Sequence, residues 1–366
     1  MRVKLEDVCE RGSSNIKQSD IIKMSGNYPI YGASGLAGKV NFYHQEQPYV
    51  AVVKDGAGIG RTTLNPAKSS VIGTMQYLIP KKNVLPEYLF YVVSYMHLEK
   101  YYTGATIPHI YFKDYKNEEF NLDNIEKQLE IIDVLGRCKK VIEARKQELV
   151  ELDSLTKARF VEMFGDPIQN PKGWEVVTIG DIVTEVRYGT SKPAVEGGKY
   201  PYLRMNNLTA DGHLDLNDLK YIDIPDDEIE KCVVRKGDVL FNRTNSIELV
   251  GKTAVFDLPE DMIIAGYIIR VRLTEKMLPE VLSQYMNLEA LKGILRGMAK
   301  GAVNQANINA QELQSIKVYI PEMELQKQFV IMKEQIYKSK FDTMTFAPIY
   351  AIINLYLHTY FYQGRR

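Results

Sequence analysis

The chain has 366 residues, enough for two domains of ordinary size, each with its own hydrophobic core. Its hydrophobic content of 45% and charged content of 25% are those of a folded globular protein, which argues against a disordered or fibrous chain. The formal net charge is zero, so any surface for nucleic acid has to be a local cluster of Lys and Arg.

The chain contains an internal repeat whose two copies lie 172 to 198 residues apart. Six short motifs of the first half recur in the same order in the second half. They are Leu5–Val8 and Ile179–Ile182, Tyr28–Tyr31 and Tyr200–Leu203, Ile59–Thr62 and Val250–Thr253, Leu85–Glu87 and Leu278–Glu280, Gly104–Ala105 and Gly301–Ala302, and Glu126–Gln128 and Glu324–Gln326. Solenoid repeats are only about 20–50 residues long, so this period indicates two whole duplicated domains.

Both copies have the same predicted order of elements. Short β-strands such as 49–53 and 238–241 come first, between Gly and Asn/Asp turns. A helical segment follows, over 86–102 in the first copy and 279–298 in the second, and then a Gly-Ala turn. An amphipathic helix closes each copy. We therefore predict an α+β fold with two tandem domains of mixed α/β structure.

The amphipathic helix of the first copy is long, because 126–164 contains no proline and a single glycine. Leu135, Ile142 and Leu149 recur every seven residues, a spacing typical of paired helices. A helix of this length cannot bury its apolar face within one small domain, so it needs a partner helix. The second copy offers one, with apolar residues in 4-3-4 spacing at Leu325, Phe329, Met332 and Ile336.

Motifs for catalysis are missing from the sequence. Gly251-Lys-Thr253 supplies only the second half of a nucleotide-binding P-loop, since Ser246 stands where the first glycine is needed. The acidic residues 226–228 follow Pro225, where a helix N-terminus favours negative charge over a metal site. The five histidines have no metal-ligand spacing, and the three cysteines have no CxxC spacing, which favours a reducing cytosol. We therefore interpret the chain as a binding protein without catalytic residues, metal or cofactor.

The segment 160–174, FVEMFGDPIQNPKGW, combines a helix stop with the entry into a new domain. It closely resembles the junction between the central helix and the second target-recognition domain of type I restriction-modification specificity subunits. The segments 26–35, 104–109, 236–243 and 301–305 also resemble motifs of that family. The resemblance covers roughly residues 1–342.

This resemblance implies two target-recognition domains, similar to the DNA-reading domain of TaqI-type adenine methyltransferases, separated by long antiparallel paired helices. The chain would read a bipartite, asymmetric double-stranded DNA target and dock two modification (methyltransferase) subunits, and in a restricting complex also restriction/translocase subunits. The partner methyltransferase would bind S-adenosylmethionine and modify adenine N6, in the cytoplasm and without a membrane. The expected division is 1–122 and 166–321 for the recognition domains, 123–165 and 322–342 for the helices, and 343–366 for a divergent apolar tail.

Candidate DNA contacts are Arg, Lys, Asn and similar residues on loops, because these types bind phosphates and base edges. They are Lys54, Arg61, Lys192, Arg204, Asn206, Asn207, Asn242, Arg243, Thr244, Asn245 and Lys252. Candidate residues of the partner-binding helices are Arg137, Lys140, Arg145, Lys146, Leu149, Leu152, Phe329 and Ile336. An ordinary polar loop remains the alternative for each member of the first set, and the segments 106–109 and 304–307 have either a structural or a DNA-contacting role.

The sequence departs from the family pattern after Phe341, where a helix as long as the central one is expected. Pro348 would break that helix, and the apolar residues 346–361 are too few for the ~20 of a membrane span. We interpret this stretch as buried or covered by a partner, and a frameshift, inversion or truncation would explain it. Two alternative functions therefore stay open: a truncated or phase-variable specificity fragment, and a coiled-coil scaffold that binds no DNA.

Overall fold

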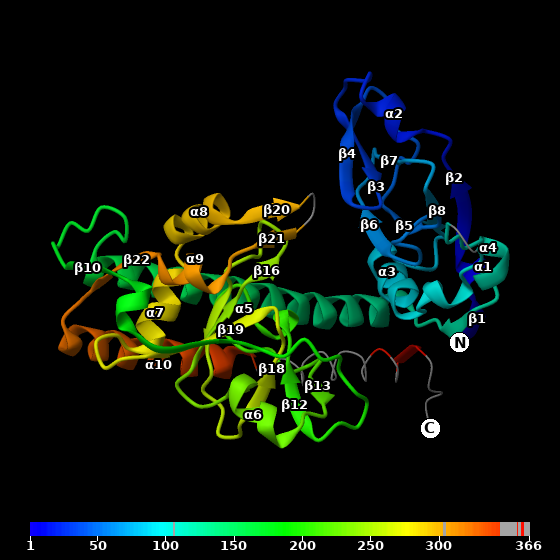
Figure 1. Cartoon of the computed structure of the whole chain (residues 1–366). Helices are drawn as coiled ribbons and strands as arrows, with labels where there is room; N and C mark the ends of the chain where they lie inside the picture. Colours follow the sequence, from blue (N-terminus) through cyan, green and yellow to red (C-terminus); the bar gives the residue numbers. More distant parts are fainter. Residues whose placement is uncertain (105–106, 303–304, 345–356, 358–359, 362–366) are drawn as a thin grey trace. The chain divides into compact units, whose positions relative to one another are not determined.

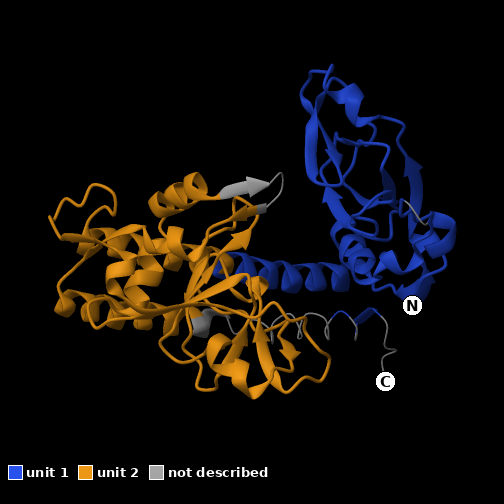
Figure 2. Cartoon of the chain, in the orientation of Figure 1, with its two compact units in different colours: residues 1–145, 345–366 blue, residues 146–344 orange. Residues whose placement is uncertain are grey.

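The computed structural model describes residues 1–104, 107–302, 305–344, 357, 360 and 361. The chain divides into two compact units (Figure 2). Unit 1 consists of residues 1–145 and 345–366, and unit 2 of residues 146–344. The predicted domain 1–122 falls within unit 1 and the predicted domain 166–321 within unit 2, whereas the central helix contributes to both.

Unit 1 is built mainly from short strands. Their bounds are β1 Arg2–Lys4, β2 Cys9–Ser13, β3 Tyr28–Gly32, β4 Gly35–Val40, β5 Tyr49–Val53, β6 Thr62–Asn65, β7 Ser70–Val71, β8 Met75–Pro80 and β9 Glu119–Asn121 (Figure 1). The main sheet is antiparallel, with the order β2-β8-β5-β6, and a second sheet has the order β4-β3-β7. All five residues of β5 are buried, as expected for a β-branched central strand.

The helices of unit 1 pack on its strands in different places, with α3 on β5, β6 and β8 and α2 on β4. They are α1 Leu5–Val8, α2 Gln18–Ile21, α3 Pro86–Tyr95, η1 Leu98–Tyr101, α4 Phe112–Tyr115 and the first part of α5 Ile125–Phe164. Pro86 is the first residue of α3, where a missing N–H costs nothing. The predicted helical segment 86–102 is wrong as one helix, because His97 takes the left-handed conformation (φ 51°) between α3 and η1.

Unit 2 has more strands, arranged in four small sheets. Their bounds are β10 Glu175–Thr178, β11 Val183–Tyr188, β12 Tyr200–Leu203, β13 Lys220–Ile222, β14 Val233–Val234, β15 Val239–Asn242, β16 Thr244–Asn245, β17 Thr253–Val255, β18 Met262–Ile264, β19 Ile268–Leu273, β20 Lys300–Ala302, β21 Gln305–Asn307 and β22 Lys317–Ile320. The two four-stranded sheets have the orders β11-β19-β15-β17 and β13-β12-β18-β14. The smaller sheets are β16-β21-β20 and the pair β10-β22.

Helices surround the larger core of unit 2. They are η2 Ile179–Ile182, η3 Met205–Asn207, α6 Asp226–Cys232, α7 Pro279–Met286, α8 Glu289–Met298, α9 Ala310–Gln314 and α10 Met323–Met344. The predicted single segment 279–298 is two helices. The side chain of Asn287 ends α7 by donating to the carbonyls of Thr253 (2.6 Å) and Ser283 (3.0 Å). The acidic residues 226–228 do begin a helix, α6, as predicted.

Within unit 2, α10 packs against the last part of α5. The ring of Phe329 lies 5.2 Å from that of Phe160 and 5.4 Å from that of Phe164, and all three side chains are fully buried. Eleven residues further along α10, the ammonium of Lys340 pairs with the carboxylate of Asp153. Along the contact the residue numbers fall in α5 and rise in α10, so the two helices are antiparallel. The predicted antiparallel pairing is confirmed here.

A buried glutamine occupies the equivalent position of each unit. In unit 1, Gln128 Oε1 accepts a bond from the N–H of Leu85 (2.8 Å), and its Nε2 donates to the carbonyls of Asn83 (3.0 Å) and Asp123 (2.8 Å). In unit 2, Gln326 Oε1 accepts a bond from Leu278 N–H (2.9 Å). Its Nε2 donates to the carbonyls of two residues, Lys276 (3.0 Å) and Pro321 (2.8 Å). Gln128 therefore ties the start of α3 to the start of α5, and Gln326 ties the start of α7 to the start of α10.

The tail region 343–366 lies largely outside the described residues, as do Pro348, Ala105, Thr106 and Asn304. Leu357 and Phe361 are described, and both are buried in the core of unit 1. The prediction of a buried segment is confirmed for these two residues. Among the described helices, no stretch is long and apolar enough to cross a membrane.

Candidate nucleic-acid interface

An equivalent loop follows β5 in unit 1 and β15 in unit 2. The last residue of β5, Val53, exchanges backbone bonds with the loop end: its N–H donates to Arg61 O and its carbonyl accepts from Gly60 N–H, both at 2.9 Å. In unit 2, the N–H of Asn242 donates to Lys252 O and its carbonyl accepts from Gly251 N–H, both at 2.8 Å. The next residues, Lys54 and Arg243, are therefore equivalent. Each also accepts a 2.9 Å backbone bond, from Ile110 in unit 1 and from Ile308 in unit 2.

We call residues 54–61 and 107–113 the first recognition edge. The carboxylate of Asp55 accepts a bond from the ring of His109 (2.7 Å) and pairs with the ammonium of Lys54 (3.2 Å). Arg61 is exposed and donates to the carbonyl of Ala33 (2.9 Å). Gly60 has φ 78°, and a Cβ there would lie 2.6 Å from the backbone nitrogen of Glu99, so only glycine fits this turn. These contacts hold two cationic side chains at one end of the sheet.

We call residues 187–188, 242–252, 266–267 and 305–308 the second recognition edge. The guanidinium of Arg243 lies over the ring of Tyr188 at 5.0 Å, and Arg243 Nη1 donates to the carbonyl of Gly266 (3.4 Å). An aromatic ring stacked on a guanidinium fixes the orientation of the guanidinium without forming hydrogen bonds to its N–H groups. Tyr188 and Tyr267 are 43% and 50% exposed, which makes their faces accessible for stacking. This edge therefore offers one oriented arginine on the Tyr188 ring, and a second half-exposed tyrosine, Tyr267, in the same edge.

Several predicted DNA contacts of unit 2 are engaged within the protein. The ammonium of Lys252 is buried and donates to the carbonyls of Met205 (2.7 Å) and Leu208, and burial lowers the pKa of Lys252. Asn242 is fully buried and donates to the carbonyls of two loop residues. Thr244 donates to the Asn307 side chain, and Asn207 donates to the carbonyl of a neighbouring turn. All four hold the loop in shape, so we leave them out of the proposed contact surface.

The remaining candidates of unit 2 are more accessible. Asn206 is exposed, and Asn245 is half-buried beside Asn242, whose side-chain oxygen it bonds at 2.8 Å. Lys192 forms an ion pair with Glu228 (2.8 Å). Arg204 is paired with Asp218 (2.7 Å). Asn206 and Asn245 fit base reading best by accessibility, whereas the two cations already have carboxylate partners.

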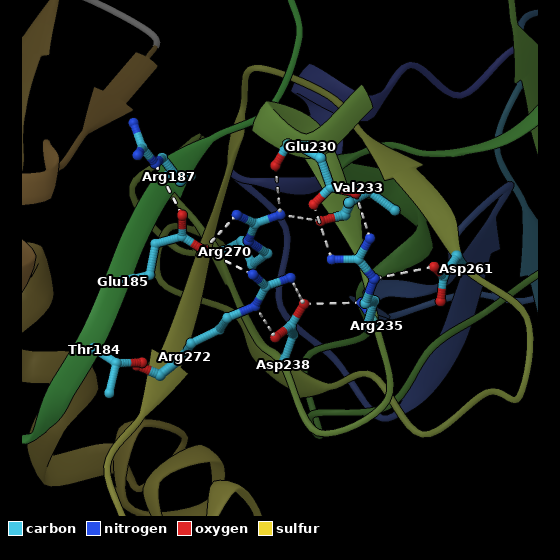
Figure 3. A network of polar contacts seen from close by, with 10 residues as sticks. All are labelled: Thr184, Glu185, Arg187, Glu230, Val233, Arg235, Asp238, Asp261, Arg270 and Arg272. Carbon is cyan, nitrogen blue, oxygen red and sulfur yellow. Dashed lines mark hydrogen bonds and ion pairs between the residues drawn. The ribbon is translucent and has the colours of Figure 1, made fainter. Parts of the chain in front are cut away.

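A charged network braces the strands behind the second recognition edge (Figure 3). Arg270 of β19 is fully buried, and its guanidinium pairs with Glu185 of β11 at 2.7 Å. Arg272 pairs with the same carboxylate (2.9 Å) and with Asp238 before β15 (2.9 Å). Burial alone would raise the pKa of Glu185, but its bonds to Arg187, Arg270 and Arg272 hold that pKa below its usual value. The network therefore fixes β11, β15 and β19, the strands that carry Tyr188 and the loop containing Arg243.

The residues predicted for partner docking fall into two groups. Arg137, Lys140, Arg145 and Lys146 lie on the exposed side of α5, and Arg137 pairs with Asp133 one turn earlier. Leu149, Leu152 and Ile336 are half-buried. Phe329 has no exposed surface, so its inclusion as a partner contact is corrected: it joins α10 to α5.

Within the described ranges, no group of three or more His, Cys, Asp or Glu side chains is arranged to hold a metal ion. The arrangement instead offers two edges with cationic, amide and aromatic side chains. Such side chains bind phosphates, base edges and stacked bases.

The comparison with protein families agrees with this geometry. The family model described as "Type I restriction modification DNA specificity domain" matches twice, over residues 1–153 and 171–347. The chain belongs to this family. The two matches also confirm the predicted internal repeat, and with it the resemblance that the junction motif indicates.

Individual relatives of the family match part of the chain. The type I restriction enzyme EcoKI specificity subunit of Escherichia coli is 29% identical over 160 residues, covering 43% of this chain and 34% of that protein. A protein of Methanocaldococcus jannaschii, provisionally named the type I restriction enzyme MjaX specificity subunit, is 33% identical over 162 residues, covering 43% of this chain and 38% of that protein. These matches therefore span little more than a third of each relative.

A solved structure resembles the whole chain in fold. The type I restriction-modification S subunit from M. genitalium gives a TM-score of 0.58 at 13% sequence identity and covers 100% of this chain and 96% of that one. The fold comparison thus supports the α+β architecture with two family domains and a long helix. At this identity it supports the fold alone.

The sequence interpretation missed two residues of the second recognition edge, Tyr188 and Tyr267. Tyr188 ends β11 directly before Gly189, where a Cβ would lie 2.1 Å from the carbonyl oxygen of Ile264. An aromatic residue followed by a glycine that needs close backbone approach is a signal that the sequence contains. What it lacks is the pairing of β11 with β19, which brings Tyr188 to Arg243.

Proposed function

We propose that this chain is the specificity subunit of a type I restriction-modification complex and reads DNA through its two recognition edges. The single observation that carries this proposal is that both units hold the loop after the central strand by the same backbone bonds but present different side chains there. Lys54 and Arg243 occupy equivalent backbone positions, and the side chains around them differ. Two copies of one frame with different contact residues are suited to reading two different DNA half-sites.

The second edge is suited to direct base reading in the major groove. Arginine recognises guanine with two parallel bonds, and each such pair contributes about 1–3 kcal/mol of discrimination. The Tyr188 ring beneath Arg243 reduces the freedom that the side chain loses on binding. The first edge presents a lysine beside a His–Asp pair, which is better suited to a phosphate together with a base acceptor.

The long helix is proposed to dock the partner subunits. Arg137, Lys140, Arg145 and Lys146 are exposed cationic side chains of α5 that suit an acidic partner surface. We propose two modification subunits as partners, and restriction subunits in a restricting complex. The modification subunits would bind S-adenosylmethionine and methylate adenine N6 in the cytoplasm, while this chain contributes recognition and no catalytic group.

The test is co-expression with the methyltransferase encoded beside this chain, followed by mapping of N6-methyladenine on plasmid DNA by long-read sequencing. A single split motif supports the proposal, and Arg243→Ala should reduce methylation at that motif while Arg2→Ala, at an exposed arginine of β1, should not. Methylation at unsplit or random sites would contradict it. Failure of the two proteins to co-purify would favour the scaffold function, and co-purification without methylation would favour the truncated, inactive fragment.

A further inference from the structure

The backbone of His109 is fixed within the first recognition edge. Its N–H and its carbonyl exchange two 2.8 Å bonds with Thr103, and it lies opposite Asp55 in an antiparallel bridge. The next residue, Ile110, donates its N–H to the carbonyl of Lys54 (2.9 Å). The side chain of His109 is 37% exposed. The edge therefore holds an accessible imidazole at a fixed place beside Lys54.

The carboxylate of Asp55 determines which nitrogen of the His109 ring carries a proton. Its Oδ1 lies 2.7 Å from Nδ1 of the ring, and an ionised carboxylate can only accept, so Nδ1 donates. In a neutral ring, the other nitrogen, Nε2, then has a lone pair and accepts. The second oxygen of Asp55 pairs with the ammonium of Lys54 (3.2 Å), so the carboxylate has a counter-charge without a charged imidazole. His109 thus offers a hydrogen-bond acceptor beside the lysine donor.

Unit 2 has a different pair of side chains at this position. Thr244 and Asn307 lie opposite each other in β16 and β21, as Asp55 and His109 do in unit 1. The hydroxyl of Thr244 donates to Oδ1 of Asn307 (2.8 Å), so the oxygen of that amide is already engaged. The two units therefore differ in hydrogen-bonding character at one equivalent backbone position. A position that distinguishes two half-sites should differ in this way.

We propose that His109 is a specificity-determining residue that accepts a hydrogen bond from an exocyclic amino group in the major groove of DNA. This inference rests on the proposed function. Adenine N6 and cytosine N4 are the amino groups of the major groove, whereas guanine and thymine present acceptors there. Adenine fits the pair of Lys54 and His109 better, because its N7 acceptor stands next to the amino group. Asp55 is the positioning residue, since it fixes the proton on Nδ1.

The first experiment finds the base pair that His109 reads. The full-length chain is co-expressed with the neighbouring methyltransferase, and N6-methyladenine is mapped by long-read sequencing. His109→Ala should relax one position, in the same half of the motif as Lys54→Ala, and Arg2→Ala, at an exposed arginine, should relax none. An A·T pair at that position identifies adenine, and a G·C pair identifies cytosine. The other half should stay intact in His109→Ala, which shows that the variant folds and assembles.

The two possible failures of this experiment are distinguishable. A wild type that methylates no split motif contradicts the proposed function. A wild type with a split motif that His109→Ala leaves unchanged overturns only the role of His109.

Duplex probes then test the amino group itself. At the identified pair, adenine is replaced by purine, or cytosine by 2-pyrimidinone, because each analogue lacks the exocyclic amino group. Fluorescence anisotropy should show binding of the assembled wild-type complex weakened by about 2- to 10-fold, as expected for one hydrogen bond. The same replacement should not weaken binding of the His109→Ala complex. Equal losses in both complexes, or no loss in the wild type, would overturn the inference.

Asp55→Asn tests the positioning role. The amide oxygen of the new side chain is held by the ammonium of Lys54, so its N–H₂ faces Nδ1 of His109 and the ring proton moves to Nε2. His109 then donates and no longer accepts, and the complex should bind the amino-free probe as well as the unmodified duplex. A variant that binds both duplexes more weakly but keeps the wild-type preference for the amino group would show that Asp55 is only structural, and would contradict the assignment.

Discussion

Unit 1 and unit 2 share their internal bracing and differ at their edges. Each has a fully buried glutamine with three bonds to the backbone, a tyrosine edge-on to a phenylalanine (Tyr88 to Phe361, Tyr285 to Phe160), and a basic residue directly after the central strand. The edges carry unlike contacts: Lys54 with Asp55 and His109 in unit 1, Arg243 on Tyr188 in unit 2. The two copies have therefore kept the contacts that position the loop and differ in the side chains at the loop.

The units also differ in how the strands behind the edge are held. Unit 2 has the network of Glu185, Asp238, Arg270 and Arg272, with one arginine fully buried. In unit 1 the equivalent strands β8 and β5 pack through apolar and tyrosine side chains such as Val50, Leu78 and Tyr77. Unit 2 should therefore depend on pH and on charge in a way that unit 1 does not.

The largest expected effect comes from the shared glutamines. Gln128→Leu should destabilise unit 1, and Gln326→Leu unit 2, each by about 3 kcal/mol or more, because one buried N–H and two carbonyls lose their partner. Chemical denaturation followed by unit-specific hydrogen exchange measures both. Gln147→Leu, at an exposed residue of α5, is the control and should change little. If Gln128→Leu destabilised unit 2, or Gln326→Leu unit 1, the equivalent roles of the two glutamines would be contradicted.

The charged network gives the next effect, confined to unit 2. Glu185→Gln should cost about 3 kcal/mol, because it leaves the buried Arg270 guanidinium without a counter-charge. Glu185→Gln should not alter exchange in α3 of unit 1.

The Glu185 carboxylate should also make the stability of unit 2 fall at acid pH. Its pKa is lowered in the folded state, so its contribution is complete above the ordinary value of 4.5 and is lost as the pH falls through the folded value. Unfolding of unit 2 monitored between pH 7 and 3 should show this loss, and the loss should be smaller in Glu185→Gln. Equal acid sensitivity of the wild type and the variant would contradict the assignment.

The recognition edges should affect DNA binding without affecting stability. Arg243→Ala should weaken binding of the assembled complex to its target by about 10- to 100-fold, as expected for one bidentate base contact. Lys54→Ala should have a smaller effect on affinity, and because Lys54 is proposed to contact a phosphate as well as a base acceptor, it should both lower the salt dependence of binding and relax the choice of that base. Fluorescence anisotropy at several salt concentrations separates the two. If Arg243→Ala reduced the affinity for target and non-target DNA by the same factor, base reading by Arg243 would be excluded.

The smallest effect is expected at Lys192, because it lies outside the residues of both recognition edges and its ammonium is paired with Glu228. Lys192→Ala should change target affinity by less than about twofold, since an exposed ion pair contributes little. A salt slope reduced by about one would instead show that Lys192 binds a phosphate when DNA is present.

The sequence predicted the repeat, the long helix and its antiparallel partner because each depends on residues close together or on a regular spacing, such as Leu135, Ile142 and Leu149. It also predicted the position of the loop after each central strand. It did not separate contact residues from bracing residues. Lys252 looks like a phosphate ligand in Gly-Lys-Thr, and only the folded chain places the carbonyls of Met205 and Leu208 around its ammonium. Tyr188 lies 55 residues before Arg243 and reaches it only because β11 and β15 both pair with β19.

The most direct test of two separately reading edges is the methylation motif of the two edge variants. Lys54→Ala and Arg243→Ala are each co-expressed with the neighbouring methyltransferase, and N6-methyladenine is mapped by long-read sequencing. The proposed function predicts that each variant relaxes one half of the split motif, that the two variants relax different halves, and that the spacer is unchanged. Relaxation of the same half by both variants, or of both halves by either one, would contradict it.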